Sequence, residues 1–198
     1  YQLEVDNARG INIGEEYVKI DGLQIKVLHT SANASAIYVG GITASNKIQI
    51  SNNILTGVFA GEGTYTGNGI EHADVDAIGY HWNNIIYGWK NVSAINYGIY
   101  MTAGASHYAY NNTIVGNQNG LRANGQAVIK NNIIKGSGNT NTYVGTFADA
   151  DNNSTDSTET PGVGSGNLTS QTFSFVSEVA GSEDFHLQSS DTGAKNQG

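Results

Sequence analysis

Asn52-Asn53-Ile54-Leu55 recurs along this chain, and its recurrence predicts the architecture. Three further copies are Asn83-Asn84-Ile85-Ile86, Asn111-Asn112-Thr113-Ile114 and Asn131-Asn132-Ile133-Ile134. A degenerate copy, Gly22-Leu23-Gln24-Ile25, precedes them, and the copies begin 30, 31, 28 and 20 residues apart. Repeats of this length are typical of solenoids, in which each repeat forms one coil that stacks on the previous coil.

A second frame, a short segment in which Gly or Ala is followed by Ile or Leu, precedes the Asn pairs. Its apolar residues are Ile11, Ile37, Ile70, Ile99 and Leu121. Side chains alternate across a strand, so we expect these residues to stack inward from coil to coil. We expect the same of Ile25, Leu55, Ile86, Ile114 and Ile134. The rest of each coil then supplies the crossover that parallel strands need.

The Asn pairs lie where the chain must turn sharply between two strands. Asn adopts the left-handed backbone conformation at lower cost than other non-glycine residues. Asn side chains that stack along a solenoid can also hydrogen-bond to the Asn above and the Asn below. We therefore predict an asparagine ladder along the axis of the solenoid.

Composition favours an all-β chain and excludes two classes of partner. The 198 residues are 38% hydrophobic and 13% charged, whereas helical proteins usually carry many Glu and Lys on their surfaces. The net charge is −8 with nine Lys and Arg, so the chain lacks the basic face that nucleic acids and anionic membrane surfaces require. No apolar run is long enough for membrane insertion. Without cysteine, the redox compartment is not indicated.

The regular frame ends before the chain does. We predict one domain, with parallel β-helix coils over residues 1–145 and a polar loop and C-terminal capping segment over 146–198. Two short apolar patches, Phe173-Ser174-Phe175-Val176 and Asp184-Phe185-His186-Leu187, remain in the second part. We assign them to an irregular cap, because an open solenoid end invites edge pairing. Since the chain begins at Tyr1 rather than Met, we expect a mature or excised part of something longer.

The Asn-Asn-Ile-Ile frame, the Gly-Ile strands and the Asp184-Phe185-His186-Leu187 tail resemble right-handed parallel β-helix proteins of the pectate-lyase-like superfamily. More narrowly, residues 10–198 are similar to poorly characterised secreted bacterial and metagenomic members. The resemblance implies an all-β, right-handed, single-stranded parallel β-helix, and the repeat count predicts five to six coils. It leaves the activity open, because the superfamily includes polysaccharide lyases, glycoside hydrolases, phage tailspikes and non-catalytic surface proteins.

An acidic cluster, Glu71, Asp74 and Asp76, is the candidate for catalysis or metal binding near the regular coils. A lyase of this fold is expected to use an acidic calcium site with an Arg or Lys base, and an inverting hydrolase needs two carboxylates that flank the scissile bond. Asp74 and Asp76 would share a face if they lay on a strand, and oxygen ligands at this density could bind Ca²⁺. No base is evident at matched positions of neighbouring coils, so a solvated acidic loop competes with both functions. No other cofactor is expected.

Four aromatic residues form the candidate ligand-binding site. Alignment of the Asn pairs places Tyr80 over Tyr108 and Trp82 over Tyr110, with about 4.8 Å between coils. If they are exposed, these rings form a platform for the apolar faces of sugars or for a protein partner. If the local register slips, the rings fill the core, and the sequence leaves both orientations open. Trp89 would extend an exposed strip.

The histidines show no metal-binding spacing of the H-x-H or H-E-x-x-H kind. His72 falls in the inward column with Val39 and Met101, and we expect a core histidine that is hydrogen-bonded to the backbone. His81 and His107 fall in the column that alternates with the aromatic residues. They would need buried partners if that column faces inward.

Three hypotheses for function follow. The leading one is a non-catalytic, secreted or surface-displayed β-solenoid, on a cell or a virion, for polysaccharide recognition or structural assembly. It is favoured by the missing base, the scarcity of arginine and the aromatic residues. The alternative is a polysaccharide lyase or glycoside hydrolase of the parallel β-helix superfamily, with Glu71, Asp74 and Asp76 in its cleft and Arg122 or Lys130 nearby. The third is a structural module that polymerises with other solenoid chains.

Overall fold

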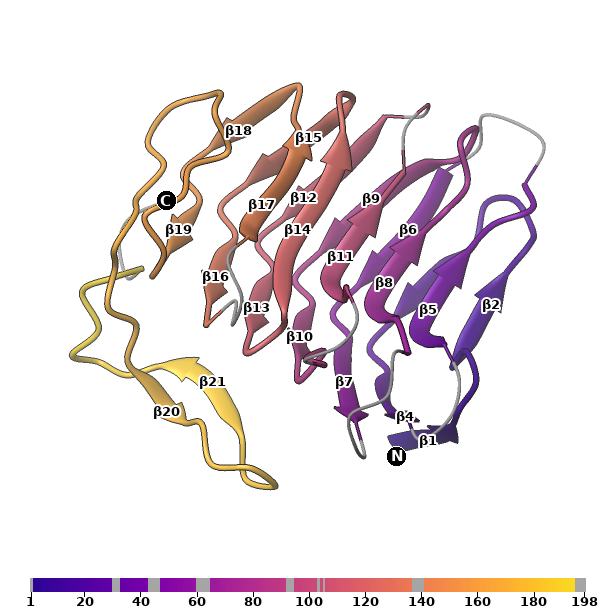
Figure 1. The fold of residues 1–198 in the computed structure, drawn as a ribbon, viewed down its shortest axis with the longest axis horizontal. Coiled ribbons are helices and arrows are strands. Elements are labelled where there is room, and N and C mark those ends of the chain that lie inside the picture. The colour runs from indigo at the N-terminus through magenta and orange to yellow at the C-terminus, as the bar shows by residue number, and fades with distance from the viewer. Residues whose placement is uncertain are drawn as a thin grey trace.

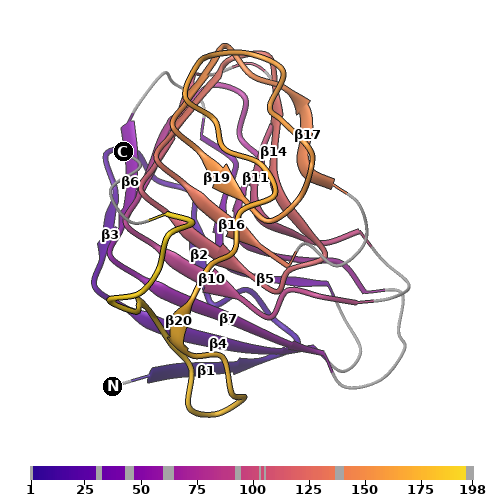
Figure 2. The same cartoon turned by 90° about the vertical axis from the view of Figure 1, so that its left-hand side faces the viewer.

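The computed structural model describes residues 2–29, 33–42, 47–59, 65–91, 95–102, 104, 106–136 and 141–194. Within these ranges the chain is all-β, without a helix, and its strands form three parallel sheets and one hairpin. Every third strand returns to the same sheet, so the chain winds around a three-sided core (Figures 1 and 2). This arrangement confirms an all-β solenoid of stacked parallel coils. No helix suited in length and apolar character to crossing a bilayer occurs in the described ranges.

The three sheets contain six or seven strands each. Sheet 1 consists of β1 (Gln2–Asp6), β4 (Gln24–His29), β7 (Ile54–Phe59), β10 (Ile85–Tyr87), β13 (Thr113–Val115), β16 (Ile133–Lys135) and β19 (Ser154–Thr155). Sheet 2 consists of β2 (Ile11–Ile13), β5 (Ala34–Val39), β8 (Gly67–His72), β11 (Tyr97–Met101), β14 (Asn119–Asn124) and β17 (Asn141–Thr146). Sheet 3 consists of β3 (Lys19–Asp21), β6 (Lys47–Ser51), β9 (Ile78–Trp82), β12 (His107–Tyr110), β15 (Ala127–Lys130) and β18 (Asp149–Asp151).

The two apolar columns stack in the predicted register. In sheet 2, Ile11, Ile37, Ile70, Ile99 and Leu121 lie opposite one another on successive strands. In sheet 1, Ile25, Leu55, Ile86, Ile114 and Ile134 do the same. All of these side chains except that of Ile11 are essentially inaccessible to solvent. Burial of these columns is the main favourable term in folding such a chain.

Each Asn pair forms the corner between sheet 3 and sheet 1, and its two residues have different roles. The first Asn of every pair has a positive φ of 54–56°, which turns the chain. The second Asn is buried and donates its side-chain amide to the next Asn along the axis, as Asn53 Nδ2 does to Asn84 Oδ1 at 3.0 Å. The remaining amide bonds of this ladder run through Asn112, Asn132, Asn153 and Asn167 at 2.9–3.0 Å.

The coils continue past residue 145, which falls inside β17. A fifth Asn pair, Asn152-Asn153, turns the chain from β18 into β19 and adds a further rung to the ladder. Its frame is less apolar than the others, since Ser154 and Thr155 stand where the earlier copies carry Ile or Leu at every position except Thr113. With six or seven strands in each sheet, the solenoid has six complete coils, which agrees with the predicted five to six, and β19 makes a single parallel bridge to Leu168.

The C-terminal strands β20 (Phe175–Ser177) and β21 (Asp184–Leu187) form an antiparallel hairpin that lies outside the coils (Figure 1). Its aromatic residues pack on the outer face of sheet 1. The Phe185 ring lies 4.9 Å from the ring of Tyr87, and Phe173 and Phe175 are buried against Val115. The apolar patches predicted for a cap therefore cover outward side chains of β10, β13 and β16 on one side of the solenoid.

Candidate functional site

The four aromatic residues of the candidate site lie on the outer face of sheet 3. Tyr80, Trp82, Tyr108 and Tyr110 are half-buried, whereas the residues that alternate with them on β9 and β12 are buried. The register pairs Tyr80 with Tyr108 and Trp82 with Tyr110, as expected from the sequence. The rings therefore face outward, which resolves the alternative that the sequence left open. We call these four residues the aromatic strip.

The rings of the strip are not equivalent. Tyr80 and Tyr108 stack face to face, with centroids 4.8 Å apart and planes 9° apart, so each ring already covers one face of the other. Tyr110 is tilted by 58° against Tyr108 at 6.0 Å. Trp82 makes no ring contact with any described residue, which leaves the indole as the strip's best surface for a further stacking partner.

Charged side chains border the strip at both ends. On β3, Asp21 accepts hydrogen bonds from Ser51 Oγ at 2.6 Å and Asn52 Nδ2 at 2.7 Å. On the other side, Lys130 Nζ lies 2.8 Å from Asp149 Oδ2 and 2.7 Å from Asp151 Oδ2. Hydrogen bonds to Asp149 and then Asp151 raise the pKa of Lys130, so it is a cation held by two anions and does not act as a base at neutral pH.

The neighbours of the strip also perturb one of its phenols. Burial and then the adjacent Tyr108 raise the pKa of Tyr110, and Lys130 opposes this only partly. Tyr110 is therefore a neutral phenol that can both donate and accept a hydrogen bond. The strip consequently combines apolar rings with neutral hydrogen-bonding groups.

Trp89 does not extend the strip. Its side chain is fully buried, its Nε1 donates to Leu55 O at 3.3 Å, and its ring fills the space that Gly57 leaves open. A Cβ on Gly57 would lie 2.7 Å from the indole, so a glycine at this position permits the buried Trp.

The acidic candidates Glu71, Asp74 and Asp76 do not converge. Glu71 lies on β8 and accepts a hydrogen bond from Ser35 Oγ at 2.5 Å, whereas Asp74 and Asp76 lie in the turn between β8 and β9 rather than on a strand. Asp74 is buried and accepts hydrogen bonds from the backbone N–H groups of Ile42, Asp76 and Ala77 at 2.7–3.0 Å. Burial opposes its ionisation, but these three bonds outweigh it and hold its pKa below the ordinary value.

This geometry explains Asp74 as a turn-forming residue. Its oxygens already serve three donors, so they are poorly placed for Ca²⁺, and Asp76 is exposed beside it. Arg122 shares the outer column of Glu71, but Tyr100 lies between them in the register. Neither of the predicted basic residues, Arg122 and Lys130, therefore lies next to these carboxylates in the structure.

His72 lies in the core as predicted. The backbone of Ala77 opposes the lowering of its pKa by burial, but no hydrogen bond of normal geometry reaches its ring among the described residues. His72, His81 and His107 are at most 1% exposed, and none of their ring nitrogens has a hydrogen-bond partner among the described residues. Burial lowers the pKa of His72 to about 3 and that of His107 to about 4, and burial holds that of His81 well below its usual range. The three rings are therefore neutral at physiological pH.

Sequence spacing did not reveal this cluster, because its members come from three strands. His72 ends β8, His81 lies on β9 and His107 begins β12 in the next coil. The signal that could have found it is the placement of His81 and His107 in one inward column of sheet 3, next to Gly79.

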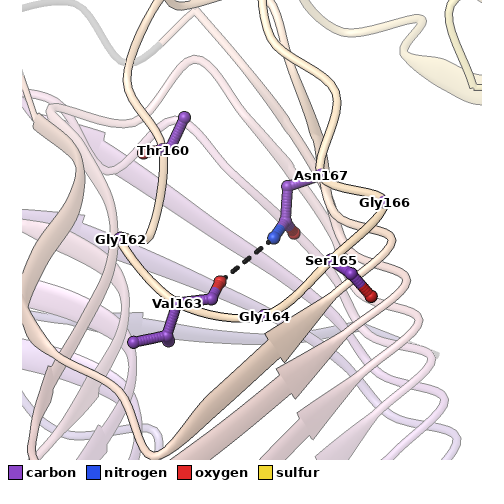
Figure 3. Close-up of a pocket in the computed structure, with 7 residues that line it drawn as sticks. All are labelled: Thr160, Gly162, Val163, Gly164, Ser165, Gly166 and Asn167. Atoms are coloured by element: carbon purple, nitrogen blue, oxygen red, sulfur yellow. Dashed lines mark hydrogen bonds between the residues drawn. The ribbon is translucent and has the colours of Figure 1, made fainter.

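A pocket near the C-terminal end is built mostly from backbone. It is lined by Thr160, Gly162, Val163, Gly164, Ser165, Gly166 and Asn167 (Figure 3). The Asn167 side chain points across the loop and donates to Val163 O at 3.3 Å. No titratable side chain lines this pocket, so it offers hydrogen-bonding groups but no acid or base.

Comparison of the chain with models of known families finds no match, and comparisons with curated proteins and with solved structures find none either.

Proposed function

We propose that this chain is a non-catalytic, surface-displayed β-solenoid that binds polysaccharide through its aromatic strip. The observation that carries the proposal is the outward orientation of Tyr80, Trp82, Tyr108 and Tyr110 on a rigid sheet. Aromatic rings fixed on a sheet lose little conformational entropy when they bind a ligand, and the apolar faces of sugars stack on them. The half-buried indole of Trp82, which stacks on no other described ring, is the central contact, and the phenol groups supply hydrogen bonds.

The charges around the strip favour a neutral polysaccharide. Asp21, Asp149 and Asp151 border it, and the chain carries a net charge of −8. A polyanionic glycan would meet like charges at both ends of the strip, whereas a neutral glycan would meet hydrogen-bond acceptors.

The finer features of the fold belong to the same proposal. We take the solenoid to be right-handed and of the pectate-lyase-like kind, because crossovers between parallel strands of one sheet are right-handed in about 98% of cases. We take the segment after β19, with the β20–β21 hairpin, to be a cap, since it covers outer apolar residues of sheet 1. Such a protein would be secreted and displayed on a cell or virion surface.

The test is a calorimetric binding assay on neutral β-glucan, xylan, mannan and galactan, with analysis of the products on the same samples. We expect binding to at least one polysaccharide, without new reducing ends or unsaturated products. Trp82→Ala should weaken that binding by about 5- to 30-fold, since one stacked aromatic residue at a binding centre contributes about 1–2 kcal/mol.

Tyr100→Ala is the matched control. Tyr100 is also half-buried and outward, but it lies on sheet 2 under Arg122, whose guanidinium carbon is 4.8 Å from the ring centroid. This variant should bind as the unmodified protein does. Equal losses in both variants would contradict the strip as the binding site. Release of cleaved fragments would make the protein an enzyme, and no binding at all would favour a purely structural role.

A further inference from the structure

The interior of the solenoid contains three histidines that pack against one another. The His72 ring centroid lies 4.5 Å from that of His107 and 5.4 Å from that of His81. One nitrogen from each ring can be chosen so that the three atoms lie within 4.8 Å of one another. Buried polar groups without partners cost free energy, because they lose their hydrogen bonds to water. A group of three such rings therefore requires an explanation.

The position that a Cβ would take on Gly79 shows that one nitrogen of each ring borders the same small space. An ideal Cβ on Gly79 would lie 2.6 Å from His72 Nδ1, 2.6 Å from His81 Nε2 and 2.8 Å from His107 Nδ1. One point inside the core is thus nearly equidistant from three nitrogens on three different rings. That point is one covalent bond from Gly79 Cα, so it marks the space that the nitrogens border and is not itself a position for a metal. A Zn²⁺ ion would lie farther from the backbone, between the three rings, and the nitrogens would have to move together to form Zn–imidazole bonds of about 2.0–2.1 Å.

We propose that His72 Nδ1, His81 Nε2 and His107 Nδ1 form a buried three-histidine site for a divalent transition metal, with Zn²⁺ as the best match. Imidazole nitrogen is a preferred ligand of Zn²⁺, Co²⁺ and Ni²⁺, whereas Ca²⁺ and Mg²⁺ take oxygen. Three protein ligands leave one tetrahedral position for a water molecule. The site is separate from the aromatic strip, because His81 points inward from the strand whose Tyr80 and Trp82 point outward.

The surroundings suit such a site in two respects. Metal ligands must be deprotonated, and these three imidazoles are neutral near pH 7. The Asp74 carboxylate interacts electrostatically with His72 and His107, so it supplies a negative charge beside a bound cation while its own oxygens stay hydrogen-bonded to the backbone. The metal would link β8, β9 and β12, and thereby join two successive coils.

The test measures metal retention by tag-free protein refolded in the presence of Co²⁺ and then desalted. Refolding is used because the site is closed to solvent. We expect one Co²⁺ per chain by elemental analysis, with the intense visible absorption of tetrahedral Co²⁺. Zn²⁺ at about a hundred times its Kd should raise the melting temperature by about 5–10 °C.

Gly79→Ala is the decisive variant, because it keeps all three histidines and places a methyl group within 2.8 Å of a nitrogen of each, which would force the rings apart. It should retain at least tenfold less Co²⁺. Gly14→Ala is its matched control, since the nearest atom to a Cβ there is Gly40 O at 3.7 Å. His186→Gln controls for surface binding, because His186 is an exposed histidine beside Asp184. Both controls should retain one Co²⁺ per chain.

His81→Leu keeps the proposal testable if Gly79→Ala does not fold. Leu is apolar and close to His in size, so this variant should melt higher than the unmodified protein without metal and should gain no stability from Zn²⁺. Three results would overturn the proposal: no Co²⁺ retained by the unmodified protein, full retention by folded Gly79→Ala or by His81→Leu, or loss of the metal in His186→Gln.

Discussion

At the residue scale, the two members of each Asn pair have different structural roles, since the first turns the backbone and the second forms the hydrogen-bonded ladder. Asn83 is exposed and has a φ of 55°, whereas Asn84 is buried and takes part in the ladder. Asn84 Nδ2 donates to Ile50 O at 2.9 Å and Asn112 Oδ1 at 3.0 Å, and Asn84 Oδ1 accepts from Asn53. Position within the pair therefore decides the cost of a substitution.

Asn84→Leu should lower the free energy of unfolding by about 3–5 kcal/mol, because it leaves buried amide and carbonyl groups on both neighbouring coils without partners. Asn83→Gly should change it by less than about 1 kcal/mol, since glycine adopts positive φ readily. Urea denaturation of both variants measures the difference. Similar values for the two would contradict the division of roles within the pair.

The buried histidines give the metal-free protein a distinctive dependence on pH. Burial lowers the pKa of His72 to about 3 and that of His107 to about 4, against about 6.5 in an unfolded chain, and only Asp74 and nearby backbone oppose this. The unfolded state therefore binds more protons below pH 6.5, so acid destabilises the folded state. Between pH 6.5 and pH 5 the loss should be about 2 kcal/mol for each histidine.

Melting curves in EDTA from pH 7 to pH 5 measure this loss. His81→Leu should show a shallower slope than the unmodified protein, because it removes one of the three groups. Equal slopes would show that carboxylates alone set the acid limit of stability.

At the element scale, the hairpin is joined to the solenoid differently from the coils. Strands within the three sheets are held by parallel ladders on successive coils, whereas β20 and β21 contact sheet 1 mainly through side chains such as Phe185 and Tyr87. A contact of this kind can open while the coils stay folded.

Phe185→Ala should therefore detach the hairpin without melting the solenoid. Hydrogen exchange should lose protection at residues 175–187 and keep it at β7, β10 and β13. Val176→Ala is the control, because Val176 is 53% exposed and should leave the exchange pattern unchanged. Loss of protection throughout the sheets in Phe185→Ala would show that the hairpin is part of the cooperative core.

Repetition explains which elements could be predicted from the sequence. Two apolar columns, through Ile70 and through Leu55, and the ladder through Asn84 were predictable. Each consists of similar residues that recur in successive coils within the same short sequence motif. The pair Asn152-Asn153 was missed, since polar residues follow it. The histidine cluster was missed because it depends on the register that brings His107 opposite Gly79 in the next coil, which no spacing along the chain reveals.

The same reasoning explains how far the candidate sites could be predicted. The pairing of Tyr80 with Tyr108 followed from alignment of the Asn pairs, but its outward orientation required the structure. Asp74 and Asp76 would share a face only on a strand, and they do not lie on one, because backbone N–H groups bond to Asp74 and hold both residues in a turn. Short-range hydrogen bonds of this kind override a strand pattern.

At the scale of the whole molecule, the charge distribution predicts how the binding of a neutral glycan and of a charged glycan would each respond to salt. The strip is apolar and its bordering carboxylates are partly neutralised by Lys130. Binding of a neutral glycan should therefore change less than about threefold when the ionic strength rises from about 0.05 M to about 0.5 M, since exposed charges are then screened. Calorimetry at the two salt concentrations measures this, and a larger change would indicate a charged ligand.

The asparagine ladder also has a direction and two closed ends. Each ladder Asn from Asn53 to Asn153 donates to the next Asn toward the C-terminus and also to a backbone carbonyl of the preceding coil. At the first rung, the backbone N–H of Leu23 donates to Asn53 Oδ1. At the last rung, Asn167 Nδ2 donates to both Ala150 O and Val163 O. The row of amides thus begins and stops within one chain and offers neither a donor nor an acceptor to another molecule. The hydrogen bonds of the ladder are therefore completed within one chain, and any fibre built from this protein would have to join through other surfaces.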